Sequence, residues 1–128
     1  MGGLSVPYAM VKALVNELSI KVPVILHLDH GSYEGAKKAI EVGYESVMFD
    51  GSHLSFAENF EKSKELKKLT EAKNVTLEVE VGTIGGEEDG IIGNGDIANP
   101  AECKQMADLN VDYLAAGIGN VHGEYPAD

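Results

Sequence analysis

The residues of this chain that could do chemistry are histidines and carboxylates placed at the ends of short apolar runs. Asp29 and His30 end the segment Val-Pro-Val-Ile-Leu-His-Leu-Asp-His, and Asp50 ends Ser-Val-Met-Phe-Asp. Glu80 lies in Thr-Leu-Glu-Val-Glu-Val, and His122 follows Tyr-Leu-Ala-Ala-Gly-Ile-Gly. Imidazole and carboxylate groups together suit zinc and similar divalent ions as ligands. One polar residue after a strand is ordinary, but its repetition after successive runs favours a metal or active site.

The apolar runs alternate with amphipathic segments, which predicts an α/β fold. We expect strands near Val22–Leu28, Ser46–Asp50, Thr76–Val81 and Tyr113–Ile118, and helices near Tyr8–Leu18, Tyr33–Val42, Phe56–Lys73 and Pro100–Leu109. Helix starts are indicated by Ser32 as an N-cap, by the capping box Ser55-x-x-Glu58, and by Asn99 followed by a proline. The strands are apolar on both faces, as in parallel sheets covered by helices. Such sheets place their chemistry at the carboxyl ends of the strands.

Four strand–helix units fit two architectures, and hydrophobic periodicity does not separate them. One is an open doubly wound sheet, complete in a single domain of residues 1–128. The other is half of a (β/α)8 barrel, whose usual length is about 250 residues. The Gly-rich segment Gly82–Gly95 is predicted as a long loop, and its glycines would let it fold over a site as a lid that carries a general base.

Several polar residues have a structural interpretation beside the functional one. Asp50 precedes a glycine and could simply begin a turn. Glu78 and Glu80 share one side of a strand, and two carboxylates on an inner face are costly without a cation. His27 shares a face with Asp29, and we expect it to make a structural hydrogen bond. His53 is expected to be a packing or capping residue, and Cys103 is expected to lie in the core.

Charge and composition exclude several classes of partner. The formal net charge is −11 with only ten basic residues, which argues against nucleic acid because phosphate binding needs clustered Lys and Arg. The longest apolar runs fall far short of the roughly 20 residues of a membrane span, and we see no secretory signal. Cys103 is the one cysteine, so a reducing compartment such as the cytoplasm is the expected setting.

Four segments together resemble the class II fructose-bisphosphate aldolases in order and spacing. They are His-Leu-Asp-His-Gly, Val-Met-Phe-Asp-Gly-Ser-His, Glu-Val-Glu-Val-Gly-Thr-Ile-Gly-Gly-Glu-Glu-Asp and Gly-Asn-Val-His-Gly-Glu-Tyr. The resemblance covers nearly the whole chain and implies a partial (β/α)8 TIM barrel, with about four strand–helix units that match the family's third to sixth strands. It implies a cytoplasmic glycolytic lyase that reversibly cleaves fructose 1,6-bisphosphate to dihydroxyacetone phosphate and glyceraldehyde 3-phosphate. It also implies a catalytic zinc ion and a homo-oligomer for the full-length protein.

The resemblance assigns a metal-binding role to four residues. His30 and His122 match two of the family's three zinc-binding histidines. Asp50 and Glu80 match carboxylates of an alternative or second metal position. A divalent ion at such a site polarises the substrate carbonyl as a Lewis acid, in place of the lysine Schiff base of the other aldolase class.

Three further residues match positions that act on the substrate. Asp29 matches the acid that exchanges a proton with the C4 oxygen of the substrate. Glu88 matches the glutamate associated with proton transfer at the carbon that becomes the enediolate. Gly123 matches the residue whose backbone touches the dihydroxyacetone phosphate half.

The departures from the family pattern predict an incomplete enzyme. No third histidine follows His122, and the family's phosphate-binding segments and first two strands have no counterpart in the chain. We therefore expect an internal fragment that is inactive alone. The alternatives are an aldolase for tagatose 1,6-bisphosphate, a non-catalytic metal-binding half-barrel, and a half-barrel that assembles with another chain or with itself.

Overall fold

A four-stranded parallel sheet forms the centre of the computed structural model, which describes residues 3–88, 91–93 and 95–125. Its strands are β1 (His27–Gly31), β2 (Ser46–Phe49), β3 (Thr76–Val81) and β6 (Tyr113–Ala116). They lie side by side in the order β1-β2-β3-β6, with all three pairings parallel. A doubly wound sheet reverses its strand order at a switch point, whereas a barrel keeps sequential strands adjacent. The observed order is that of a barrel segment.

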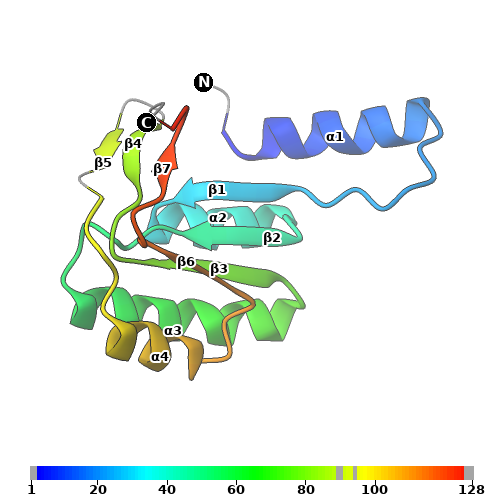
Figure 1. The fold of residues 1–128 in the computed structure, drawn as a ribbon. Helices are drawn as coiled ribbons and strands as arrows, with labels where there is room; N and C mark the ends of the chain where they lie inside the picture. Colours follow the sequence, from blue (N-terminus) through cyan, green and yellow to red (C-terminus); the bar gives the residue numbers. More distant parts are fainter. Residues whose placement is uncertain (1–2, 89–90, 94, 126–128) are drawn as a thin grey trace.

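The connecting helices begin where local sequence predicts, and two of the three also end there, whereas the last ends at Ala107 and not at the expected Leu109. They are α2 (Tyr33–Val42), α3 (Phe56–Lys73) and α4 (Pro100–Ala107), and they lie on one face of the sheet (Figure 1). The Ser32 hydroxyl accepts a hydrogen bond from the backbone N–H of Gly35, and α2 ends at Gly43 with a φ of 110°. The Asn99 side chain caps α4 by accepting from the N–H of Ala101 at 2.9 Å. Each cap satisfies backbone groups that the first or last turn leaves without a helical partner.

The core lies between the sheet and these helices. Its largest fully buried apolar side chains come from both layers: Phe49, Leu66, Leu77, Met106, Val47 and Val79. Alternate residues of each strand point to one face, which places the side chains of Val47, Phe49, Leu77 and Val79 against the helices. Cys103 is half-buried and packs at the margin of this core.

Helix α1 (Ser5–Glu17) differs from the others because none of its residues is buried. It extends away from the sheet in Figure 1. The Tyr44 hydroxyl donates to the carbonyl of Leu4 at 3.1 Å, and the Tyr8 and Tyr44 rings stack at 6.4 Å. Lys12 Nζ lies 2.5 Å from Glu45 Oε1. These contacts attach α1 to the body of the protein along one side only.

The predicted boundaries of the first strand were wrong. The apolar run at Val22–Leu28 was expected to form the strand, but pairing begins at His27, which faces Ser46. Val22 and Ile25 are instead 69% and 60% exposed. An apolar run pairs only where a neighbouring strand offers its backbone, and β2 begins opposite His27. Asp29 and His30 therefore lie inside the strand, next to its carboxyl end, and do not follow it.

The segment Gly82–Gly95 was wrongly predicted to be a loop throughout. It contains strands β4 (Gly85–Glu88) and β5 (Ile91–Gly93), which pair antiparallel, and β4 also pairs parallel with β7 (Val121–His122). In the antiparallel pair, Glu88 faces Ile91 and Gly86 faces Gly93. This small sheet lies at the carboxyl ends of the central strands (Figure 1). Within the described residues, no helix has both the length and the apolar character that crossing a membrane requires.

Candidate metal centre

Three strands of the central sheet bring metal-capable side chains to one place. One ligand atom each from His30, Asp50 and Glu80 lies within 4.8 Å of the others. His30 Nδ1 is 2.9 Å from Asp50 Oδ2. His122 reaches the same place from β7, and its ring centroid is 5.5 Å from that of His30 in an edge-to-face arrangement. Two imidazoles and two carboxylates therefore converge at the carboxyl ends of adjacent parallel strands.

The backbone of β1 is irregular where it presents His30. The pairing register shifts between Leu28 and Gly31, and His30 has a φ of 42°. A non-glycine residue in this conformation costs on the order of 1–3 kcal/mol, and such residues cluster at functional sites. A Cβ on Gly31 would lie 2.7 Å from the carbonyl oxygen of Met48, so only glycine fits beside β2. The irregularity turns the His30 side chain toward Asp50.

Asp50 is held as a charged carboxylate. Its Oδ1 accepts hydrogen bonds from the Ser52 backbone N–H at 3.0 Å and from the Ser52 hydroxyl at 2.7 Å. Burial opposes ionisation, but the hydrogen bonds from Ser52 and His30 outweigh it and lower the pKa of Asp50. The turn interpretation of Asp50 and the ligand interpretation are compatible, because the two oxygens serve different partners.

Glu80 differs from Asp50, because its surroundings favour the protonated carboxyl and not the charged carboxylate. The residue is only 2% exposed, and burial, reinforced by the nearby Asp50 charge, raises the pKa of its carboxyl. Oε1 accepts from the backbone N–H of Ile84 at 3.2 Å. Oε2 is buried, and the described residues give it no hydrogen-bond donor. A divalent cation between Glu80 and Asp50 would offset both the mutual repulsion and the burial, so this donor set fits a metal ion.

Asn59, on the inner face of α3, contacts the backbone of the strands that carry Glu80 and Asp50. Its Nδ2 donates to the backbone carbonyl of Glu80 at 2.8 Å, and its Oδ1 accepts from the Ser63 hydroxyl at 3.2 Å. A Cβ on Gly51, the residue after Asp50, would lie 2.3 Å from Asn59 Oδ1. The residue pattern at the strand ends gave no indication of Asn59. A signal for Asn59 exists in the sequence of α3. The buried face of this helix, which is normally apolar, carries three polar residues beside one leucine: Asn59, Ser63, Leu66 and Thr70.

Asp29 lies outside the group of ligand atoms. Its side chain is 65% exposed, and its Oδ1 is 4.0 Å from His27 Nε2. His27 makes a structural contact through its other ring nitrogen, 2.7 Å from the Ser46 hydroxyl, and its Nε2 is 3.7 Å from Glu78 Oε2. The structure therefore keeps Asp29 accessible beside His30 without making it part of the convergent set.

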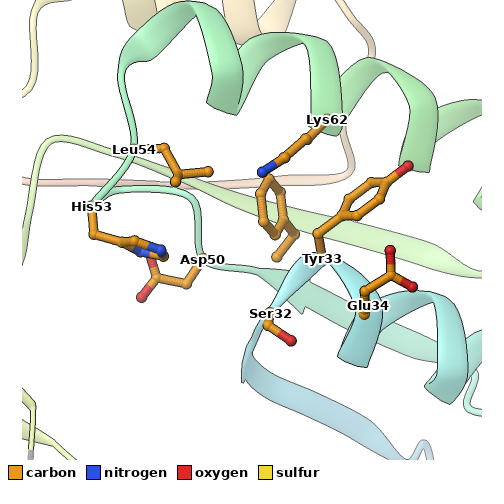
Figure 2. Close-up of a pocket in the computed structure, with 8 residues that line it drawn as sticks. Ser32, Tyr33, Glu34, Asp50, His53, Leu54 and Lys62 are labelled. Carbon is orange, nitrogen blue, oxygen red and sulfur yellow. The ribbon is translucent and has the colours of Figure 1, made fainter.

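The remaining candidates lie around the centre. Gly123 follows β7 with a φ of 103°, and a Cβ there would meet nothing within 4 Å. Glu88 ends β4, and its side chain lies outside the part of the chain that the structure describes. Exposed His53 lines a pocket that adjoins the metal centre through Asp50 and is closed on the other side by Tyr33 and Lys62 (Figure 2).

Comparisons with known proteins agree with the residue pattern. A family model described as fructose-bisphosphate aldolase class-II matches residues 1–128. The chain is 62% identical over 126 residues to the fructose-bisphosphate aldolase of Mycoplasma pneumoniae and 60% identical to that of Mycoplasma genitalium. Each match covers 98% of this chain and 44% of the relative, so the chain spans less than half the length of these relatives.

Solved structures show the same fold. A protein of Coccidioides immitis assigned as a fructose-1,6-bisphosphate aldolase superposes with a TM-score of 0.76 at 34% identity, over 91% of this chain and 44% of that one. The YdjI aldolase of Escherichia coli K12 superposes with a TM-score of 0.72 at 27% identity, over 93% of this chain and 42% of that one. These matches confirm the predicted α/β class and partial barrel. With the family model matched from end to end, the chain belongs to the class II fructose-bisphosphate aldolases.

Proposed function

We propose that this chain contributes the metal-binding part of an aldolase active site that cleaves fructose 1,6-bisphosphate, with zinc as the ion. The observation that carries the proposal is the convergence of His30, Asp50 and Glu80 within 4.8 Å, next to His122. A catalytic zinc site normally has three protein ligands and one open position. His30 and His122 would hold the catalytic ion, and the two carboxylates would hold an alternative or second position.

The reaction needs two proton transfers as well as an electrophile. Cleavage of the C3–C4 bond leaves a carbanion beside a carbonyl, and a bound divalent ion supplies the Lewis acid that polarises this carbonyl. Asp29 would take the proton of the C4 hydroxyl, for which its 65% exposure and its place next to His30 are suited. Because Asp29 lies outside the ligand group, its protonation leaves the metal ligands in place. Glu88 would manage the proton at the enediolate carbon.

This chain would supply only some of the contacts that position the substrate, and segments that it does not contain would supply the others. The backbone at Gly123 is open to solvent and would contact the dihydroxyacetone phosphate half of the substrate. The third zinc-binding histidine and the phosphate-binding segments of the family have no counterpart in these 128 residues. Positioning of reactants supplies on the order of 7–11 kcal/mol of a barrier. We therefore propose that the chain alone binds zinc weakly and has no appreciable aldolase activity.

The test is to join this chain to the missing segments of the Mycoplasma pneumoniae relative, which is 62% identical over 126 residues. The joined protein should cleave fructose 1,6-bisphosphate in preference to tagatose 1,6-bisphosphate, and a chelator should abolish the activity. Asp29→Asn should lower turnover by roughly 10²–10⁴-fold with the zinc content unchanged. His30→Ala, the matched control, should lose zinc as well as activity. Full activity after exhaustive metal removal would refute the proposal, and preferential cleavage of the tagatose ester would refute its substrate.

A further inference from the structure

A hydrogen-bonded row of three side chains crosses the first residues of β1, β2 and β3. His27 is paired with Ser46, and Ser46 is paired with Thr76. His27 Nδ1 lies 2.7 Å from Ser46 Oγ, and the Thr76 hydroxyl donates to the same oxygen at 2.7 Å. The row lies on the face of the sheet opposite the helices, because Val47 and Leu77, the next residues along, belong to the core. The mechanism proposed above uses none of the three side chains.

The other ring nitrogen of His27 faces two carboxylates. Its Nε2 lies 3.7 Å from Glu78 Oε2 and 4.0 Å from Asp29 Oδ1. Asp29 comes two positions after His27 on β1, and Glu78 comes two positions after Thr76 on β3. Both distances exceed the 2.7–3.2 Å or so of an ordinary N–H···O hydrogen bond. The ring therefore stands between the two carboxylates and is bonded to Ser46 alone.

These surroundings place a proton on Nε2 of His27. A ring nitrogen without a proton presents a lone pair, which two nearby carboxylates would repel. Thr76 donates to the Ser46 oxygen, which leaves the Ser46 proton available to donate to Nδ1. The neutral imidazole thus accepts at Nδ1 and carries its proton at Nε2, on the side of Asp29 and Glu78.

We propose that His27 is a positioning residue for Asp29, an inference that rests on the role proposed for Asp29 above. In the substrate complex Nε2–H donates to one oxygen of the Asp29 carboxylate, which leaves the other oxygen directed at the C4 hydroxyl. Hydrogen bonds of catalytic groups are often long before substrate binds and tighten in the complex, which accounts for the 4.0 Å distance. Ser46 and Thr76 hold the ring from the other side, so its orientation is set by the sheet and not by the substrate.

Two substitutions that each keep one half of the imidazole test this proposal in the joined protein described above. His27→Gln places an amide nitrogen near the position of Nε2 and gives up the contact with Ser46. His27→Asn places its amide near the position of Nδ1 and does not reach Asp29. We expect His27→Asn to lower kcat on the order of a hundredfold, as misplacement of a reacting group does, and His27→Gln to retain most of it. KM and zinc content should stay near the parent values in both variants, because Asp29 acts in the transition state and is not a ligand.

A double substitution separates action through Asp29 from action elsewhere. Residues that act as a unit are strongly non-additive, so His27→Asn should lower kcat no further once Asp29→Asn is present. Ser46→Ala is the matched control at the other ring nitrogen. It should lower kcat less than His27→Asn does, because Nε2–H and both carboxylates remain.

The tautomer of His27 gives a readout that needs no activity. In alkaline solution, above the ordinary histidine pKa of about 6.5, nitrogen NMR of the 128-residue chain should show the His27 proton on Nε2. The signals that His27→Gln removes identify this ring among the four histidines. Because the measurement needs neither zinc nor substrate, it is independent of the proposed function.

Three outcomes would overturn the proposal. A kcat in His27→Asn equal to or above that in His27→Gln would mean that the ring serves only Ser46 and the packing of the sheet. A full further loss of kcat in the double variant would mean that His27 acts through Glu78 or through the fold. A proton found on Nδ1 would leave Asp29 without its donor. Full turnover in Asp29→Asn alone is a distinguishable result, because it would refute the role proposed for Asp29 and this inference with it.

Discussion

The centre of the sheet and the α1 flank, residues 5–25, are built from similar sequence patterns but are packed very differently. At the centre, β2 is buried along its whole length, and α2 and α3 each bury residues against it and its neighbour β3. In the α1 flank, no helical residue is buried, and the apolar run before β1 is exposed. A short helix is marginal in water unless an apolar face packs against other elements, and α2 and α3 have such packing whereas α1 has little of it. Asp50 and Glu80 come from the packed centre, and His30 comes from the strand that borders the flank.

The largest expected difference between the two regions is in the cost of losing one leucine side chain. Leu66 on α3 is 1% exposed, so Leu66→Ala should lower the free energy of unfolding by about 2–5 kcal/mol. Leu14 on α1 is 52% exposed, so Leu14→Ala should change it by less than about 0.5 kcal/mol in dilute protein. Urea unfolding measures both.

Equal costs for the two leucines in dilute protein would contradict the comparison. That result would mean that α1 packs in the monomer as firmly as α3 does. Proteolysis gives an independent check, because cleavage in residues 5–25 should precede cleavage in α3 if the flank opens separately.

The next expected effect is within the centre, at the buried support of the metal ligands. Asn59→Ala removes the donor to the Glu80 carbonyl and should cost about 1–3 kcal/mol, since the carbonyl stays buried. Ser63→Ala is the matched control on the same buried face of α3 and should cost less, because it removes only the hydrogen bond to the Asn59 side chain. Urea unfolding reports stability and zinc titration reports affinity. If Ser63→Ala proved as damaging to zinc affinity as Asn59→Ala, the support would belong to the whole buried face and not to Asn59.

The sequence predicted the centre well because its signals are local. Caps at Ser32, Ser55 and Asn99 and the β3 boundaries depend on neighbouring residues, and the structure has them as expected. The start of β1 could not be predicted, because strand pairing depends on where β2 offers its backbone. The hairpin in Gly82–Gly95 carried an Asp-Gly turn signal, but its glycines also fit a loop.

The candidate site was predicted in its residue types and not in its geometry. Strand order along the sequence indicated that His30, Asp50, Glu80 and His122 share one end of the sheet. The hydrogen bond from Asn59 could not be predicted, because it depends on how α3 packs on the sheet. The lowered pKa of Asp50 and the raised pKa of Glu80 depend on the burial and hydrogen bonds of each carboxylate, which the sequence alone does not give. The positive φ of His30 is likewise a consequence of the packing of β1 on β2.

A third prediction concerns the pH dependence of the metal-free chain. The pKa of Asp50 is lowered from its usual value of 3.8, so its ionised form stabilises the fold above that value, and the contribution is lost as pH falls through the folded pKa. The pKa of Glu80 is raised from 4.5, so its protonated form stabilises the fold below that value, and this contribution is lost as pH rises through the folded pKa. Glu80→Gln should therefore remove a decline in the free energy of unfolding on the alkaline side of 4.5.

Glu78→Gln is the matched control on the same strand and should leave that decline in place. Zinc should also remove the decline in the parent chain, because a cation favours the ionised form of Glu80. Urea midpoints measured from acid to neutral pH, with and without zinc, give the result. A decline that survived Glu80→Gln would assign it to another group and would weaken the electrostatic argument for a cation at this site.

The smallest expected effect tests how the α1 flank is attached. Tyr44 is 4% exposed, and its hydroxyl donates to the carbonyl of Leu4. Tyr44→Phe keeps the ring that stacks on Tyr8 and removes one hydrogen bond, so it should cost about 0.5–1.5 kcal/mol. Amide hydrogen exchange should accelerate in α1 and stay unchanged in α3, because the flank opens separately from the centre. Tyr113→Phe, at an exposed tyrosine of β6, should leave exchange in α1 unchanged. Acceleration spread evenly over α1 and α3 would mean that the two regions unfold as one unit. The α1 flank and the centre of the sheet would then differ in how exposed their side chains are and not in their local stability.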